Sequence, residues 1–283
     1  MATLRAKATS GDSDAALELA FRYDFDPPRN RRRALRWYRV AADLGHVDAQ
    51  NYLGELLRDH VSTPDAKHEA VSWFKRAAAS DHSEAQVSLG VSLFYGEGVS
   101  RNRTLALKWY RRASSRGNAS AMFNIGQMYR TGQGVRKNVD QALHWYRRAA
   151  AKGNAGAAHW LARIYDGLED RPERTRAAIR WLKRAADLGD AQSMCNLGVR
   201  FFNGQGVPQD RAKAAVLYHD AANAGDEWAA YLLGLCYLEG TGKRRNRQHA
   251  RAWFEKSDAK GVKEAQDALE QMDIQDLQKT RCD

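Results

Sequence analysis

The chain has 283 residues, of which 43% are hydrophobic, and its 45 Lys and Arg outnumber 34 Asp and Glu to give a net charge of +11. This composition is typical of a protein with a packed core, and no run of about eighteen apolar residues predicts a membrane-spanning helix. The positive charge favours an acidic partner, which could be a protein, a nucleic acid or a membrane surface, although a solvated surface and an arginine-preferring codon bias explain it equally well.

The first residues of the chain lack the apolar stretch of a signal peptide. We therefore expect a cytoplasmic protein, unless a signal peptide has been removed. Cys195, Cys236 and Cys282 are odd in number and share no equivalent position in the repeats described next, which favours reduced thiols over a disulfide framework.

A pair of helices joined by a loop recurs every 36 residues along the chain. The second helix of each pair carries one marker position, occupied by Trp37, Trp73, Trp109, Trp145, Trp181, Leu217 and Trp253. Such a period predicts an all-α solenoid, in which each helical hairpin packs on its neighbours.

In chain order, a partial unit at residues 1–10 precedes seven repeats. The repeats span residues 11–45, 46–81, 82–117, 118–153, 154–189, 190–225 and 226–261. Residues 262–283 form a polar helix that we expect to cap the stack. Because no long linker interrupts the series, we expect a single domain.

Recurring residues have structural roles. Small residues in the first helices, such as Gly90 and Gly126, allow close helix packing, and loop glycines end these helices with positive φ. Asn102 and Asn138 stand where second helices begin and are suited to cap them. We expect the recurring Trp and Tyr residues to form the core rather than a cofactor site. Pro27, Pro28, Pro64 and Pro172 replace the glycine loop in three units, which changes the loop but not the helix pair.

The consensus A-x-x-x-L-G-x-x-Y-x-x-G-x-G-V, followed by Asn or Asp and then A-x-x-W-Y-x-x-A-A-x-x-G, resembles the Sel-one-like repeat, a relative of the tetratricopeptide repeat. The resemblance covers nearly the whole chain. It implies a right-handed superhelix of about seven antiparallel helix pairs with a concave inner face. It also implies the family's usual role in holding proteins together, commonly in bacterial regulation, and in some members the neutralisation of toxins.

The sequence contains no catalytic or metal-binding motif. Eight histidines are scattered, and although His46 and His82 share a position in adjacent repeats, no HExxH or paired-cysteine pattern accompanies them. The GTGK segment at residues 240–243 lacks the remaining residues of a phosphate-binding loop. We therefore expect no enzyme, no metal and no cofactor.

Arginines and lysines gather in the loops between the two helices of each repeat, and these loops should share one edge of a solenoid. They are Arg31, Arg32, Arg33, Arg101, Arg103, Arg136, Lys137, Arg244, Arg245 and Arg247. The turns at the opposite edge carry mainly Asp and Glu. The basic edge could bind phosphates or an acidic protein surface, but aromatic residues for stacking on bases do not alternate with the arginines.

A second candidate surface follows from the resemblance, because positions just before the buried Leu-Gly pair line the concave groove of related repeats. The candidate groove residues are Tyr52, Asn124, Trp160, Asn196, Trp228, Leu232 and Leu235. Trp228, Leu232 and Leu235 form an apolar end of this groove, whereas Asp48, Glu55 and Asp59 make its other end acidic. Alternatively, Tyr52 and Trp160 are additional core residues.

Taken together, these patterns predict a non-enzymatic scaffold or adaptor that binds one or more proteins, expected to have an acidic surface, in its concave groove. A toxin-neutralising protein is one form of this function. The alternative is binding of nucleic acid or another polyanion along the basic edge, which the missing aromatics make less favourable. No motif specifies an individual partner or an oligomeric state.

Overall fold

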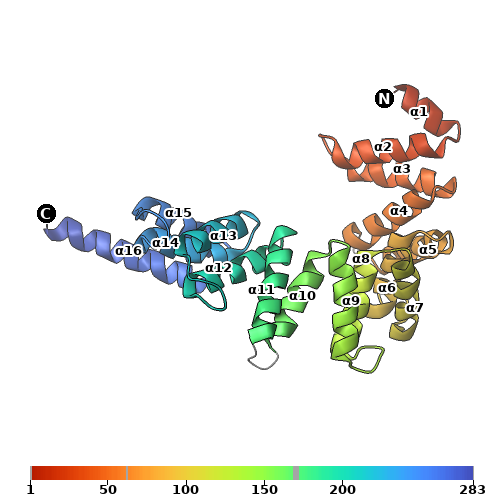
Figure 1. Cartoon of the computed structure of the whole chain (residues 1–283). Helices are drawn as coiled ribbons and strands as arrows, with labels where there is room; N and C mark the ends of the chain where they lie inside the picture. The colour runs from red at the N-terminus through yellow and green to blue at the C-terminus, as the bar shows by residue number, and fades with distance from the viewer. Residues whose placement is uncertain (1, 62, 168–171, 283) are drawn as a thin grey trace. The chain divides into compact units, whose positions relative to one another are not determined.

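The computed structural model describes residues 2–61, 63–167 and 172–282, and side chains as far as residue 275 (Figure 1). Within these residues all regular secondary structure is α-helical. The first helices of the hairpins are α2 (Ser13–Phe25), α4 (Val47–His60), α6 (Ser83–Tyr95), α8 (Ala119–Thr131), α10 (Ala155–Asp166), α12 (Ala191–Asn203) and α14 (Glu227–Glu239). The second helices are α3 (Arg31–Asp43), α5 (Pro64–Ala79), α7 (Arg103–Ser115), α9 (Val139–Ala151), α11 (Pro172–Asp187), α13 (Arg211–Asn223) and α15 (Arg247–Asp258). Helices α1 (Ala2–Thr9) and α16 (Lys263–Cys282) precede and follow the seven hairpins.

The chain divides into two compact units, residues 1–152 and 153–283. In the first unit α2 packs on α3, α3 on α4, and so on in sequence to α9. In the second unit the same succession runs from α10 to α16. Each helix therefore packs mainly on its neighbours in the chain, which confirms the predicted all-α, solenoid-like fold. The single-domain organisation stays a prediction.

Side chains at the helix starts satisfy backbone N–H groups that have no partner within the helix. As predicted, Asn102 and Asn138 cap α7 and α9, with Oδ1 accepting from Leu105 N and Gln141 N at 2.9 Å in both cases. The first helices are capped in the same way, which the sequence analysis missed. Their caps are Asp12, His46, His82, Asn118, Asn154, Asp190 and Asp226.

The recurring glycine of each first helix lies against an aromatic ring of the second helix. A Cβ atom added at Gly126 would lie 2.7 Å from the Tyr146 ring, and one at Gly90 would lie 2.4 Å from Tyr110. Both distances are far below van der Waals contact, so only glycine fits. This confirms that the glycines permit close helix packing.

The core prediction needs a correction at the tryptophan position. Trp37 and Trp73 are buried, but Trp109, Trp145, Trp181 and Trp253 are only partly buried. The residue after each of them is buried instead, as Tyr146 and Phe254 show with 0% exposure. On a helix, adjacent positions point about 100° apart, so only one of the two can face the hairpin partner fully. The tryptophans lie at the core boundary, where Arg148 stacks 4.6 Å from the centre of the Trp145 ring.

The proline-containing repeats keep the helix pair, as expected. Pro64 is the first residue of α5, and Thr63 caps this helix through Oγ1, which accepts from Ala66 N at 3.3 Å. Pro172 likewise begins α11, while the charged loop just before it, at residues 168–171, lies outside the described residues. Proline at a helix start lacks only an N–H group that would have no partner in the helix.

Candidate protein-interaction face

The predicted groove residues lie on the first helices, and we call the exposed side of these helices in each unit its first-helix face: α2, α4, α6 and α8 in the first unit, and α10, α12 and α14 in the second. In the first unit, α6, α7 and α8 surround a hollow of about 530 Å³. Phe94, Tyr95 and Phe123 provide aromatic walls, and the predicted groove residue Asn124 lines the same hollow. Tyr95 is 66% exposed, so this aromatic surface is open to a partner.

The second unit has a hollow of about 430 Å³ at the equivalent place between α10, α11 and α12. Its walls are polar, with Arg163, Arg200, Asp166 and the predicted residue Asn196 among them. Arg200 forms an ion pair with Asp166 across the hollow, from α12 to α10. The same backbone frame therefore supports an aromatic hollow in one unit and a charged hollow in the other.

The remaining groove residues of the second unit differ in exposure. Trp228 is 42% exposed and its ring lies 5.1 Å from that of Tyr231. Leu232 and Leu235 are partly buried and pack against core clusters. Trp160 is also partly buried, with the guanidinium of Arg163 4.7 Å from its ring centre. The structure therefore places Trp228 at the surface and the two leucines at the core margin.

Tyr52 lies on α4 in the first unit and is 38% exposed. Its ring is 5.1 Å from Phe21 of α2 and 5.9 Å from Tyr38 of α3, so it is both a packing residue and a surface residue. Burial, followed by the charges of Asp48, Glu55 and Glu84, raises the pKa of the Tyr52 hydroxyl. This end of the first-helix face is therefore aromatic and negatively charged.

The loops between paired helices pack on the first turn of the preceding second helix. A Cβ at Gly134 would lie 2.7 Å from Cβ of Arg103 in α7, and one at Gly98 would meet the backbone carbonyl of Lys67 in α5. Of the predicted basic residues, Arg103 and Arg247 are half-buried, whereas Arg31, Arg32, Arg33, Arg101, Arg136, Lys137, Arg244 and Arg245 are exposed. Asp65, Asp140 and Asp210 lie at the same helix starts, so the basic edge also carries carboxylates.

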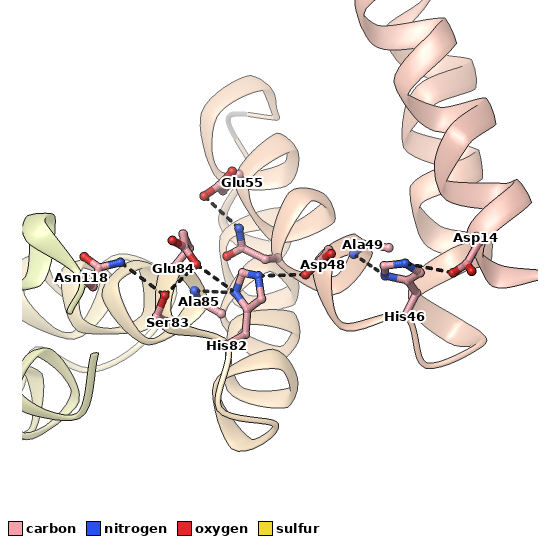
Figure 2. A network of polar contacts seen from close by, with 11 residues as sticks. Asp14, His46, Asp48, Ala49, Glu55, His82, Ser83, Glu84, Ala85 and Asn118 are labelled. Atoms are coloured by element: carbon pink, nitrogen blue, oxygen red, sulfur yellow. Dashed lines mark hydrogen bonds and ion pairs between the residues drawn. The ribbon is translucent and has the colours of Figure 1, made fainter. Parts of the chain in front are cut away.

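At the opposite ends of the hairpins, histidines link successive first helices (Figure 2). His82 Nδ1 accepts from Ala85 N at 3.1 Å and caps α6, while its Nε2 contacts Asp48 of α4 at 3.1 Å. His46 caps α4 and contacts Asp14 of α2 at 3.3 Å in the same way. These histidines therefore cap one helix and contact the preceding hairpin at the same time.

Asp81 occupies a position where other repeats have glycine, and it adopts a φ of 65°. Its carboxylate accepts from Arg112 at 2.5 Å and pairs with Arg116 at 2.6 Å. The hydrogen bond from Arg112, against a burial contribution of opposite sign, lowers the pKa of Asp81. The predicted acidic turns are therefore largely occupied by caps and ion pairs within the protein.

His159, Ser193 and Asp190 lie together in the second unit but are arranged for packing. Nδ1 of His159 lies 2.9 Å from Ser193 Oγ and 3.3 Å from Asp190 Oδ1, so one nitrogen serves both neighbours. Asp190 Oδ1 also accepts from Ser193 N at 2.7 Å and caps α12. Burial raises the pKa of Asp190, but the bonds from His159 and Ser193 outweigh it and leave the pKa lowered. The cluster thus stabilises a helix start.

Cys195 and Cys236 carry free, buried thiols, in agreement with the predicted reduced state, while the side chain of Cys282 lies outside the described part. Burial and the nearby Asp226 carboxylate raise the pKa of Cys195 to about 12, so its thiol stays protonated. Within the described residues no group of His, Cys, Asp or Glu is placed to hold a metal ion. No described helix is long and apolar enough to cross a bilayer.

Helical hairpins of near-constant length, stacked in sequence, define the chain as an α-solenoid of the tetratricopeptide-related class. The family model of the Sel1 repeat matches residues 13–46, 47–82, 83–118, 119–154, 155–190, 191–226 and 229–261. The chain belongs to the Sel1 repeat family. Sel1 repeat proteins are generally protein-interaction scaffolds, and their fold is typically non-catalytic.

Solved structures of bacterial proteins share the fold. The chain is 31% identical to c5321, a protective antigen of uropathogenic Escherichia coli strains with an SLR fold, with a TM-score of 0.72 over 93% of this chain and 57% of that one. The chain thus spans little more than half the length of that protein. A Sel1 repeat protein from Oxalobacter formigenes is 28% identical, with a TM-score of 0.63 over 76% of this chain and 84% of that one.

An immunity protein from Pseudomonas aeruginosa, PA5088, is 19% identical with a TM-score of 0.53, over 75% of this chain and 81% of that one, and this likeness concerns the fold alone. Among curated proteins, none shows significant similarity to the chain.

The sequence analysis missed two features of this face. The capping role of His46 and His82 could have been found, because the equivalent positions in other repeats carry Asp or Asn. The aromatic walls of the first hollow carried no recognisable signal, since Tyr95 and Phe123 do not occupy the recurrent aromatic positions of the repeat.

Proposed function

We propose that the chain is a non-enzymatic scaffold or adaptor that binds a partner protein or peptide on the first-helix face. The observation that carries this proposal is the pair of equivalent hollows lined by Asn124 in one unit and Asn196 in the other. The two hollows occupy equivalent positions in their units, but one is lined by aromatic side chains and the other by charged ones. A constant frame with variable walls is suited to a tailored binding surface.

The exposed aromatics of this face supply further contact area. Trp228 and Tyr52 are at least one-third exposed, and rigid aromatic side chains of this kind dominate the energetics of protein interfaces. Trp160, Leu232 and Leu235 contribute at the margin of the core, where part of each side chain is accessible. The arginines of the loops would then speed encounter with an acidic surface of the same partner.

Capture of partners from the native cells by variant proteins tests this function. Tyr52→Ala and Trp228→Ala remove partly exposed rings and introduce no charge, so they are sharper probes than Leu232→Asp, which would place a charge at a core margin. We expect both substitutions to reduce recovery of the specific partner, whereas Arg245→Ala leaves it unchanged. Unchanged capture by the Tyr52→Ala/Trp228→Ala double variant would refute the proposal.

Neutralisation of a toxin is one specific form of this scaffold function. The immunity protein PA5088 has the same fold, and an inhibitor needs only a fitted surface and no catalytic group. Co-expression of the chain with a toxin encoded beside its gene tests this form. Rescue of growth that Trp228→Ala abolishes would support it, and growth arrest despite full expression of the chain would count against it.

The exposed arginines favour one alternative, binding of a polyanion along the loops. Exposed basic side chains lie in the loops just before second helices, at Arg101, Arg136, Lys137, Arg244 and Arg245. Binding of this kind weakens steeply with salt, because each neutralised phosphate releases counterions. Titration of a labelled duplex DNA at increasing salt tests this alternative. A DNA affinity that falls steeply with salt, and less steeply in Arg244→Ala/Arg245→Ala, supports it, whereas an affinity that does not change with salt excludes it.

A further inference from the structure

Four aromatic rings from three helices meet at the N-terminal end of the first-helix face. Phe21 lies 6.1 Å from Phe25, 5.9 Å from Tyr38 and 5.1 Å from Tyr52, measured between ring centres. Tyr38 is buried, but Phe25 is 60% exposed and Tyr52 is 38% exposed. The core uses one side of this aromatic cluster and leaves the other side open to solvent.

Carboxylates from the same helices surround the aromatic cluster. Asp24 accepts from the Tyr38 hydroxyl at 3.2 Å, and Glu55 accepts from Asn51 Nδ2 at 3.2 Å. Asp48, one turn before Tyr52 on α4, contacts the His82 ring at 3.1 Å. None of these three contacts comes from an arginine or a lysine, so the three carboxylates place negative charge beside the rings.

The tyrosines respond to this local charge. Burial contributes most to the raised pKa of Tyr38, followed by Asp24, then by Tyr52 and Glu55. For Tyr52 the charged groups that raise the pKa, after burial, are the carboxylates of Asp48, Glu55 and Glu84. The nearby cation Arg58 pairs with Asp59 at 2.7 Å and also interacts with Glu55. The ionised groups that raise the pKa of the two tyrosines are carboxylates, although the whole chain carries +11.

We propose that this aromatic and acidic cluster binds an arginine- or lysine-bearing extended segment of a partner protein, which deepens and rests on the scaffold function proposed above. A guanidinium or ammonium group stacks on exposed aromatic faces and is stabilised by carboxylates at their rim. The same carboxylates repel phosphate groups, which separates this site from the polyanion alternative. The occupant is opposite in charge to the acidic surface that the loop arginines favour.

Fluorescence anisotropy of labelled peptides with the full chain tests the proposal. The probes are an alternating Arg-Gly decapeptide and an alternating Glu-Gly decapeptide of equal length. A protein of net charge +11 should favour the acidic peptide, so tighter binding of the basic peptide reports the local field. We expect that preference, and we expect Tyr52→Ala and Glu55→Gln each to weaken binding of the basic peptide about fivefold.

Matched variants separate the site from general effects. Glu55→Gln keeps an acceptor for Asn51, and Tyr52→Phe keeps the ring that packs on Phe21 and Tyr38, so it should bind the basic peptide better than Tyr52→Ala does. Glu255→Gln removes one exposed carboxylate in the second unit and should leave the affinity unchanged. Circular dichroism checks that every variant has wild-type helix content.

Any of three peptide-binding results overturns the proposal: equal or tighter binding of the acidic peptide, undiminished binding by the Tyr52→Ala/Glu55→Gln double variant, or an equal loss in Glu255→Gln. The proposal would also be overturned if the wild-type chain self-associates in sedimentation and the double variant does not. The cluster would then bind the arginine loops of a second copy of the chain. If the peptide test fails but Trp228→Ala still loses partner capture, the cluster proposal is wrong and the scaffold function is still supported.

Discussion

At the scale of single residues, side chains at the hairpin turns perform two tasks at once. His82 caps α6 through Nδ1 and reaches the preceding hairpin through Nε2, which contacts Asp48. In the equivalent position Asn118 caps α8 and donates to Ser83 Oγ at 3.5 Å. One residue per repeat therefore both starts a helix and joins that helix to the previous hairpin.

This double role predicts a graded response to substitution at His82. His82→Ala removes the cap and the inter-hairpin contact and should cost about 1–2 kcal/mol of unfolding free energy. His82→Asn, the cap used at Asn118 and Asn154, should lose less because it still accepts from Ala85 N. Urea denaturation measures both values. Equal losses in the two variants would contradict a capping role.

Replacing the recurring glycine of a first helix by alanine should destabilise the protein, although alanine has the higher helix propensity. Gly126→Ala should improve the intrinsic helix propensity of α8, yet its Cβ would clash with the Tyr146 ring. We expect a net destabilisation of about 1–3 kcal/mol, the usual range for overpacking a core. Gly167→Ala is the control, because the nearest atom to its added Cβ is 3.4 Å away. A more stable Gly126→Ala protein, measured by thermal denaturation, would be inconsistent with this packing.

The ion pairs of Asp81 should make the stability of the protein depend on pH. Since Arg112 holds its pKa below the ordinary value, the ionised carboxylate is favoured in the folded state. This stabilisation is fully present above the unfolded pKa, about 3.9, and is lost as pH falls through the lower folded pKa. Asp81→Asn tolerates the left-handed backbone but lacks the charge. The stability difference between wild type and variant should therefore shrink as pH falls from 7 toward about 3. A constant difference would exclude this contribution.

At the scale of whole elements, α16 closes the second unit. Met272 of this helix is 2% exposed and lies in one cluster with Phe254 of α15. Arg247 donates to the Met272 carbonyl at 2.7 Å and to Gln275 Oε1 at 3.0 Å, which joins the start of α15 to α16. The sequence predicted a capping helix here, and Met272 shows that its contact is apolar as well as polar.

Truncation of the Met272 side chain tests the capping contact. Met272→Ala should cost about 2–5 kcal/mol, because it removes a buried side chain and leaves a cavity. Ile274→Ala, two residues further on the same helix, removes a side chain that is 54% exposed and should have little effect. Similar denaturation midpoints for both variants would show that α16 does not cover the core.

Much of the element structure could be predicted from sequence, because each signal is local and repeated. Loop glycines such as Gly132 and caps such as Asn138 act within a few residues, so their spacing marks the hairpins directly. The choice between Trp145 and Tyr146 as the core residue could not be predicted, since it depends on the orientation of the partner helix. The cluster around Tyr52 also escaped prediction, because it joins α2, α3 and α4.

At the scale of the whole molecule, each unit has its own core, and repeat proteins transmit stability mainly between neighbouring repeats. Ile125 and Leu233 hold equivalent positions in the two units, and both are 0% exposed. Ile125→Ala should raise amide hydrogen exchange mainly in α6–α9, and Leu233→Ala mainly in α12–α15. A uniform rise along the whole chain in either variant would instead support a single cooperative domain.

The central claim is that the first-helix face, rather than the loop edge, contacts the partner. Photocrosslinking residues placed singly at Asn124, Asn196, Arg101 and Arg136 test this claim most directly. Arg101 and Arg136 are exposed, and Asn124 and Asn196 line open hollows, so each substitution should preserve the fold. The account predicts that irradiation links the partner from Asn124 or Asn196 and not from the loops. Cross-links from Arg101 and Arg136 alone would contradict it.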